Sequence, residues 1–204
     1  MNENKTANLL PCDGQLILHN SILDTATSLV YFEMLLESIP WRSDEVFIYG
    51  KKIVTKRKMA WFALDDLNYT YSGITRSPEA FTKELIELKV IAESYCNDHF
   101  NACLLNLYHS GNEGMGWHSD NESSIVKGST IASISLGEAR PFQLRHKKSG
   151  DKVQVLLENG SLLLMLGSTQ EHWQHSLPKT PKVKGPRINL TFRKMVTGQH
   201  QSHK

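Results

Sequence analysis

Two side chains that can bind a metal, His118 and Asp120, stand two residues apart in the sequence WHSD. In an extended segment, residues two apart project to the same side, so an imidazole and a carboxylate there can hold one ion. His175 lies downstream, after several predicted strands that can return the chain beside the first pair. Two neutral imidazoles and one carboxylate on one face of an octahedron leave three open positions, which suits non-haem Fe(II) and oxygen chemistry.

Other chemistries remain open for these three side chains. A histidine and an aspartate two residues apart occur often by chance, so a structural or surface role is possible for that pair. Zinc-dependent hydrolysis would use a similar donor set, but it would need a nearby general base and no second co-substrate. The choice between these readings therefore depends on what surrounds the predicted metal.

Polar side chains with the same two-residue alternation occupy one face of two further predicted strands: Asn106 and Tyr108 on the first, and Arg187, Asn189, Thr191 and Arg193 on the second. Two arginines that point inward near a metal call for an anion, since a buried unpaired charge costs several kcal/mol. A dicarboxylate meets that demand. Six residues of strand cover about 20 Å, so the two arginines can share one small ligand only if they lean toward each other.

The first half of the chain reads as helices and loops that could support these strands. Leucine and phenylalanine recur at helical spacing between Asp24 and Ile39, and Pro40 ends that helix. A second helix is predicted to begin at 77–79, where Ser, Pro and Glu are typical of a helix start. Its predicted buried stripe consists of Phe81, Leu85, Leu88, Ala92 and Tyr95.

From about Phe100 onward, short β-rich runs alternate with turn residues. The pair Asn159-Gly160 stands between two apolar runs and predicts a two-residue hairpin. Many short strands without intervening helices favour an antiparallel sandwich or jelly roll, with the earlier helices packed against one sheet. The predicted division is an extension at 1–20, helices and a lid at 21–99, a core at 100–196 and a disordered tail at 197–204, all in one folded unit.

Composition agrees with one intracellular globular unit. The chain has 204 residues, of which 40% are hydrophobic and 22% charged, with a net charge of +2. Its first residues lack a secretion signal, and its three cysteines fit free thiols in a reducing compartment. We expect a cytoplasmic protein, nuclear in a eukaryote, that is monomeric and makes no contact with membranes. A basic cluster at 51–58 is compatible with a polyanionic partner, although such a run is usually a solvated face.

The sequence resembles the AlkB-type Fe(II)- and 2-oxoglutarate-dependent nucleic-acid dealkylases from about Trp41 to Met195. The blocks that carry the resemblance are YTYSGI, CLLNLYHSG, WHSDNE, IASISLG, HWQHSLPK and PRINLTFRK. The resemblance implies an α+β fold: a double-stranded β-helix (jelly-roll) core buttressed by N-terminal helices, with a nucleotide-recognition lid.

The resemblance also implies the iron ligands, the co-substrates and the reaction. His118, Asp120 and His175 would bind Fe(II), and His175 rather than His172 is the ligand because it directly precedes Ser-Leu-Pro. The side chains that would hold 2-oxoglutarate are Asn106, Tyr108, Arg187, Asn189 and Arg193. With O2, 2-oxoglutarate would become succinate and CO2 while an alkyl group on a base such as 1-methyladenine or 3-methylcytosine is hydroxylated and lost as an aldehyde.

A base inside a duplex cannot reach a buried iron, so the nucleotide must be flipped or already single-stranded. By resemblance, the residues that would contact single- or double-stranded alkylated DNA are Tyr69, Tyr71, Glu122, Phe47, Trp61 and Lys51. Tyr71 would stack on the base opposite His118, and Glu122 could accept a hydrogen bond from an exocyclic amine. The run VFIYGKKIVTKRK resembles the family's lid, whose apolar tip can wedge between bases while lysines contact phosphates; an ordinary β-hairpin is the alternative.

Two rival functions remain at the level of sequence. The same chemistry could act on RNA or on a protein side chain, although the basic and apolar lid favours nucleic acid. A non-catalytic, cupin-like protein could hold a metal and a small acid, and it would bind both without forming succinate.

Overall fold

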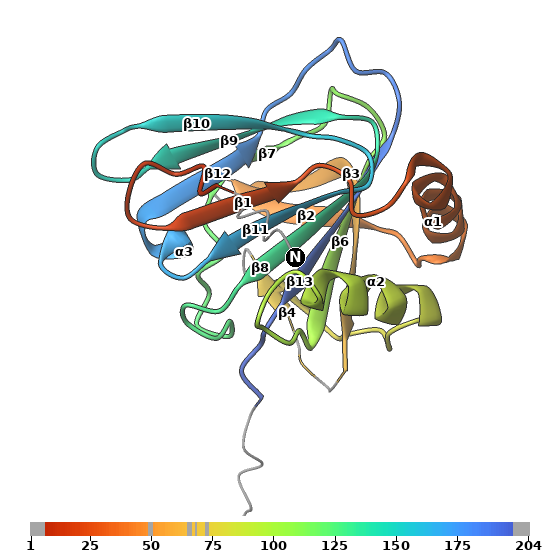
Figure 1. The fold of residues 1–204 in the computed structure, drawn as a ribbon. Coiled ribbons are helices and arrows are strands. Elements are labelled where there is room, and N and C mark those ends of the chain that lie inside the picture. The colour runs from red at the N-terminus through yellow and green to blue at the C-terminus, as the bar shows by residue number, and fades with distance from the viewer. Residues whose placement is uncertain (1–6, 49–50, 65–66, 68, 72–73, 198–204) are drawn as a thin grey trace, which may run out of the picture.

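The computed structural model describes residues 7–197 except 49–50, 65–66, 68 and 72–73, and for 44–48, 51–53, 69–71 and 74–76 it describes the backbone alone. Two β-sheets face each other, and two longer helices lie beside the larger sheet (Figure 1). Among the helices of these described residues, none has the length and apolar character needed to cross a membrane.

The larger sheet has seven strands. In spatial order they are β1 (Gln15–His19), β11 (Ser161–Leu166), β8 (Ile131–Gly137), β13 (Arg187–Arg193), β6 (Ala102–Tyr108), β3 (Lys51–Ala63) and β2 (Arg42–Ile48). The smaller sheet consists of β10 (Lys152–Leu157), β9 (Arg140–His146), β12 (Trp173–Leu177) and β7 (Met115–His118). All of these pairings are antiparallel, and the two sheets form the predicted jelly roll.

The interpretation of the first half as helices and loops is wrong for five strands, β1 to β5. β1 pairs with β11, and β3 pairs with β6, so early segments extend the larger sheet at both of its edges. Beyond β3, the short strands β4 (Tyr69–Tyr71) and β5 (Ile74–Arg76) form a separate two-stranded sheet. The run 51–63 mixes basic and apolar residues without a clear period, and its pairing with the buried strand β6 decides its structure.

Helix α1 (Thr25–Ser38) confirms the first predicted helix, with the Asp24 side chain capping it by accepting from the backbone N–H of Thr27. The predicted start of the second helix is wrong, because α2 (Lys83–Glu93) begins after Thr82, whose side chain accepts from the N–H of Leu85. The segment before it is extended, since the backbone at Glu79 bonds to β3 at residues 61 and 63.

The stripe on α2 is only partly as predicted. Leu85, Leu88 and Ala92 are fully buried, whereas Tyr95 lies beyond the helix and is 40% exposed. Because α2 ends at Glu93, the helical period no longer places position 95 against the sheet.

Two hydrophobic layers lie on opposite faces of the larger sheet. One joins α1 and α2 to the sheet and contains Ile188, Leu190 and Phe192, which confirms both the helical buttress and the predicted core-facing side of β13. The other joins the two sheets and contains Leu104, Leu144 and Trp173. The opposite face of β13 is therefore left to look into the space between the sheets.

The predicted hairpin at Asn159-Gly160 is wrong. β10 pairs with β9 in the smaller sheet, whereas β11 pairs with β8 and β1 in the larger one, so the turn carries the chain between sheets. Gly160 has a φ of 75°, and a Cβ there would lie 2.5 Å from the carbonyl oxygen of Leu23. Local turn residues thus indicate the reversal correctly but do not reveal which sheet each flanking strand joins.

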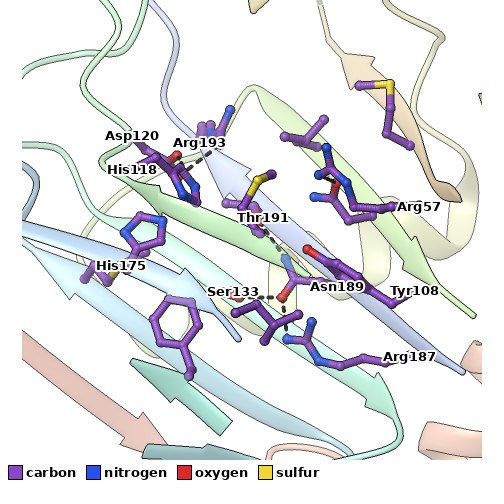
Figure 2. Close-up of a pocket in the computed structure, with 17 residues that line it drawn as sticks. Arg57, Tyr108, His118, Asp120, Ser133, His175, Arg187, Asn189, Thr191 and Arg193 are labelled. Carbon is purple, nitrogen blue, oxygen red and sulfur yellow. Dashed lines mark hydrogen bonds and ion pairs between the residues drawn. The ribbon is translucent and has the colours of Figure 1, made fainter. Parts of the chain in front are cut away.

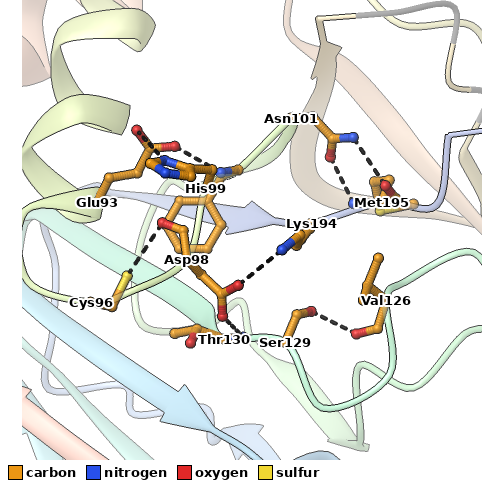
Figure 3. Close-up of polar contacts among 11 residues, drawn as sticks. Glu93, Cys96, Asp98, His99, Asn101, Val126, Ser129, Thr130, Lys194 and Met195 are labelled. Atoms are coloured by element: carbon orange, nitrogen blue, oxygen red, sulfur yellow. Dashed lines mark hydrogen bonds and ion pairs between the residues drawn. The ribbon is translucent and has the colours of Figure 1, made fainter.

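Polar contacts fix the end of β13 that carries Arg193 (Figure 3). Asp98 accepts from the backbone N–H of Thr130 at 2.8 Å and forms an ion pair with Lys194 at 3.3 Å. The Asn101 side chain bonds to both backbone groups of Met195, at 3.0 and 2.7 Å. These bonds join the start of β6 to the chain just after β13 and hold Arg193 in place.

Candidate metal and co-substrate site

The structure brings His118, Asp120 and His175 together between the two sheets (Figure 2). His118 ends β7 and is the direct cross-strand partner of His175 on β12, with ring centroids 4.2 Å apart. Asp120 follows two residues after β7, and its Oδ1 lies 3.7 Å from Nε2 of His118. Since the three ligand atoms all lie within 4.8 Å of one another, one ion can contact all three.

Each histidine is oriented by a neighbour. Nδ1 of His118 lies 2.8 Å from the carbonyl oxygen of Gly116. A carbonyl can only accept, so Nδ1 carries the proton and Nε2 keeps a lone pair for the metal. His175 stacks on Phe142 with centroids 5.3 Å apart. Burial, and then the neighbouring His118, lowers the pKa of His175 to about 3, so this ring is neutral near pH 7 and can act as a ligand.

Asp120 is buried and held from two sides. Its backbone N–H donates to Oε1 of Gln170 at 2.9 Å, and its Oδ2 lies 3.0 Å from Nη2 of Arg193. Burial raises the pKa of this carboxyl, but Arg193, followed by the neighbouring His175 and His118, outweighs it and brings the pKa to about 2. Asp120 is therefore ionised, with Oδ2 bound by Arg193 and Oδ1 directed toward His118.

The inward face of β13 forms the floor of the same pocket, as the alternation predicted. Arg187 is 2% exposed, and its Nη2 donates to Oγ of Ser135 at 2.9 Å and to Oδ1 of Asn189 at 2.8 Å. Oδ1 of Asn189 also accepts from Ser133, and its Nδ2 donates to Thr191 at 2.7 Å. This network fixes Arg187 at the end of the pocket opposite Arg193 (Figure 2).

Arg187 is a buried cation without a carboxylate partner among the described residues, and its Nε is a buried donor that makes no hydrogen bond there. Burial lowers the pKa of its guanidinium to about 10, which measures how poorly the positive charge is compensated. A small carboxylate entering the pocket would supply both the missing charge and an acceptor. Arg193, in contrast, is already paired with Asp120, so the two arginines have different surroundings.

Asn106 and Tyr108 line the pocket from β6, directly beside β13. The Asn106 side-chain oxygen accepts from Nη1 of Arg57, a contact that the sequence did not suggest. Arg57 belongs to the basic cluster at 51–58, for which a solvated face and a polyanionic partner were the two alternatives, yet it is 5% exposed and lines the pocket. A run of basic residues gives no indication of which member turns inward, because that depends on the strand's pairing.

Further lining residues also went unnoticed at the level of sequence, and they are mainly apolar: Met59, Leu104, Met115, Ser133, Phe142, Met165 and Leu177. Gln170, which positions Asp120, was likewise missed. The lining residues come from strands of both sheets and resemble ordinary core positions, so no local pattern distinguishes them.

The expected substrate residues fall into three groups. The side chains of Phe47, Lys51, Tyr69 and Tyr71 lie outside the described residues. Trp61 is 2% exposed, packs in the layer between the sheets and lies outside the described lining of the pocket, and its contact with DNA stays a prediction. Its indole N–H donates to the carbonyl of Leu67 at 2.8 Å, which explains why the ring points into the core.

Glu122 lies beside the metal site rather than in the main pocket. It lines a neighbouring hollow together with Asp120 and Gln170, and its Oε2 is buried with no hydrogen-bond partner in the part of the chain described. An acceptor left in this state is suited to a donor from a bound molecule. His172, the neighbour that could be mistaken for a ligand, lies at the end of α3 (Thr169–His172) and outside the cluster of three.

The model of the 2OG-Fe(II) oxygenase superfamily matches residues 14–193 of this chain. The chain belongs to this superfamily. DNA oxidative demethylase ALKBH2 of Homo sapiens is 40% identical over 159 residues, which are 74% of this chain and 61% of that protein. Alpha-ketoglutarate-dependent dioxygenase alkB homolog 3 of Homo sapiens is 34% identical over 190 residues, covering 88% of this chain and 66% of that protein.

These relatives confirm the resemblance of this superfamily member to AlkB-type proteins. The chain spans about three fifths of the length of relatives such as ALKBH2 of Bos taurus, where the match covers 57% of that protein. A solved structure, that of OsALKBH1, superimposes with a TM-score of 0.63 at 17% identity, covering 91% of this chain and 99% of that one, and it supports the jelly-roll fold.

Proposed function

We propose that this chain oxidatively removes alkyl groups from base nitrogens in DNA, as at 1-methyladenine and 3-methylcytosine, with Fe(II), 2-oxoglutarate and O2. The observation that carries the proposal is one pocket holding His118, Asp120 and His175 at one end and the uncompensated cation Arg187 at the other. That pairing of a three-ligand metal site with an acid-binding cation fits oxygen activation with a carboxylate co-substrate.

The three ligands fit Fe(II) by donor type and protonation state. The neutral imidazole of His175, the ring of His118 and one ionised carboxylate are present, and the carboxylate is held by Arg193 on its far oxygen. Fixing the ligands before the metal arrives keeps three coordination positions open for small ligands. When bound there, Fe(II) with 2-oxoglutarate supplies the oxidising chemistry, at the cost of one O2 and with succinate and CO2 as products.

For 2-oxoglutarate, Arg187 is the proposed partner of the distal carboxylate. Its guanidinium can form charge-assisted hydrogen bonds through Nε and one Nη, since Nε makes no bond of its own here. Asn106, Tyr108 and Asn189 line the path from this end to the metal, and Arg193 stands on the metal side. In this assignment Arg187 binds and orients the co-substrate, and Arg193 orients a metal ligand.

The substrate assignment is supported by the relatives and by the surroundings of the metal. Relatives at 34–40% identity are named as DNA oxidative demethylase and alkB homolog 3. Apolar side chains such as Met115, Phe142 and Leu177 line the pocket near the histidines and suit the flat face of a base. We assign Tyr71 to stacking on the flipped base, Glu122 to its exocyclic amine, and the tip with Phe47 and Lys51 to the DNA strand.

The test starts from anaerobic protein with Fe(II), 2-oxoglutarate and an oligonucleotide carrying 1-methyladenine or 3-methylcytosine. After oxygen is admitted, mass spectrometry should show the unmodified base and an equivalent of succinate. Asp120→Ala should abolish both while leaving DNA affinity largely intact. Parallel arms with methylated RNA and with peptide test the rival substrates, and turnover only in one of those arms would refute the DNA assignment.

A further inference from the structure

A second cluster of metal-ligand side chains lies apart from the triad and shares no residue with it. Sγ of Cys12, a carboxylate oxygen of Asp13 and a ring nitrogen of His146 all lie within 4.8 Å of one another. Cys12 and Asp13 precede β1, whereas His146 ends β9. The cluster thus joins the start of the chain to the smaller sheet.

His146 provides the strongest sign that a ligand belongs here. The ring is 4% exposed, and Nε2 is a buried atom with no hydrogen-bond partner in the described structure, 3.3 Å from Oδ2 of Asp13. Trp173 packs against the ring at 5.0 Å and His172 at 6.2 Å between centroids, so its orientation is fixed. A rigid, nearly buried imidazole therefore directs an unsatisfied nitrogen at a carboxylate and a thiol.

The other ring nitrogen has the outer partners that metal-bound histidines use. Nδ1 lies 2.8 Å from Oγ of Ser149, and that hydroxyl donates to Oδ2 of Asp151 at 2.6 Å. When Nδ1 donates to Ser149, Nε2 carries a lone pair toward Asp13 and Cys12. In the other tautomer, Nδ1 accepts from the Ser149 backbone N–H at 3.0 Å and Nε2–H faces Asp13. This N–H can only donate, so it favours the second tautomer when no cation is bound. The first arrangement binds a cation, and the second is a plain histidine–aspartate pair.

The backbone around Cys12 and Asp13 is also held in place. Trp173 donates its indole N–H to the carbonyl of Cys12 at 3.1 Å, and the Asn8 side chain donates to the carbonyl of Gly14 at 3.0 Å. Asp13 adopts a φ of 49°, a conformation that aspartate tolerates better than most residues. The Cys12 side chain is exposed, so an ion can enter from solvent without rearrangement of the core.

We propose that Cys12, Asp13 and His146 form a second metal site for a borderline-soft divalent cation, Zn²⁺, with water as the fourth ligand. Thiolate, carboxylate and imidazole in a tetrahedral set match zinc. Binding releases the thiol proton to solvent and forms the S–Zn bond, with no change of oxidation state. The bound ion ties the N-terminal segment to the end of β9.

The test uses Co²⁺ as a spectroscopic substitute for Zn²⁺ in the full-length, metal-free protein. Only a thiolate ligand gives a sulfur-to-cobalt charge-transfer band, so this band separates the second site from the triad, which contains no sulfur. The wild type should show the band with one equivalent of metal beyond that bound by the triad. Asp120→Ala should keep the band, and added Zn²⁺ should remove it by displacing cobalt.

Cys12→Ser should lose the band and one equivalent of metal, and because Cys12 is exposed this change should leave the fold intact. Cys96→Ser is the matched control, since Cys96 is a partly buried thiol outside the cluster, and it should keep the band. Ser149→Ala should weaken metal affinity by about 10- to 100-fold, as loss of an outer partner does. No band in the wild type, or a band that survives Cys12→Ser, would overturn the proposal and leave a histidine–aspartate pair.

Discussion

Replacing Arg187 with methionine should separate co-substrate binding from stability. The side chain is 2% exposed and its charge has no carboxylate partner among the described residues. Methionine keeps much of the volume while removing the guanidinium. We therefore expect weak binding of 2-oxoglutarate in a protein that still folds.

The magnitude follows from the contacts of Arg187. A hydrogen bond to a charged group contributes about 1.5–3 kcal/mol, so losing the contact to the carboxylate should raise the Kd for 2-oxoglutarate roughly 10- to 150-fold. Stability should change little. Two hydrogen bonds, to Ser135 and Asn189, are lost at about 1 kcal/mol each, but an uncompensated buried charge is also removed. A net change within about 1 kcal/mol moves the Tm by no more than about 4 °C.

The assay measures 2-oxoglutarate binding to the anaerobic Fe(II) protein and, separately, thermal unfolding of the metal-free protein. Arg42→Met is the matched control, because Arg42 is a solvent-exposed residue paired with Glu79, and neither quantity should change appreciably. The reasoning is refuted if Arg187→Met binds 2-oxoglutarate within about threefold of the wild type. It is equally refuted if the metal-free Arg187→Met variant is strongly destabilised, since the protein would then have compensated the charge of the Arg187 guanidinium in the wild type.

Three further perturbations test other parts of the structure. Gln170→Ala removes the acceptor for the Asp120 backbone N–H and should weaken Fe(II) binding about 10- to 100-fold, measured by titration with Fe(II). Gln143→Ala is the control, because this half-buried side chain bonds to Gln154 rather than to a predicted metal ligand, and it should leave Fe(II) binding unchanged. The second perturbation is pH. The pKa of His175 is about 3 in the folded protein and 6.5 as its ordinary value, so between these values the unfolded chain binds one more proton than the folded chain. Chemical denaturation of the apo protein should therefore show the free energy of unfolding falling as the pH drops from about 6.5 toward 3, and a flat profile would contradict a buried neutral ring. Gly160→Ala should destabilise the protein by more than about 1 kcal/mol in the same measurement, because φ is 75° and a Cβ would meet Leu23 and Ser28. Gly150→Ala is the control, since Gly150 also has a positive φ but nothing lies within 4 Å of its Cβ. The difference between the two variants gives the part of the destabilisation that is due to the steric contacts.

The types and spacing of residues in the sequence predicted which polar side chains share one face of the strands that line the site. His118 and Asp120 two residues apart, and polar residues alternating with Ile188, Leu190 and Phe192 on β13, are local patterns with a period of two. Such patterns depend only on the geometry of an extended chain, so the sequence predicts them without any knowledge of tertiary contacts. The cap of α1 at Asp24 is local in the same sense, and it too is confirmed.

What the tertiary structure decided depends on pairings between distant segments. Strand register determines three features of the site. They are the cross-strand contact between His118 and His175, the different contacts of Arg187 and Arg193, and the inward orientation of Arg57. The Asn159-Gly160 turn shows the same limit, because its residues indicate a reversal but not a change of sheet. Register is set by burial summed over many strands at once, and no short stretch of sequence contains that sum.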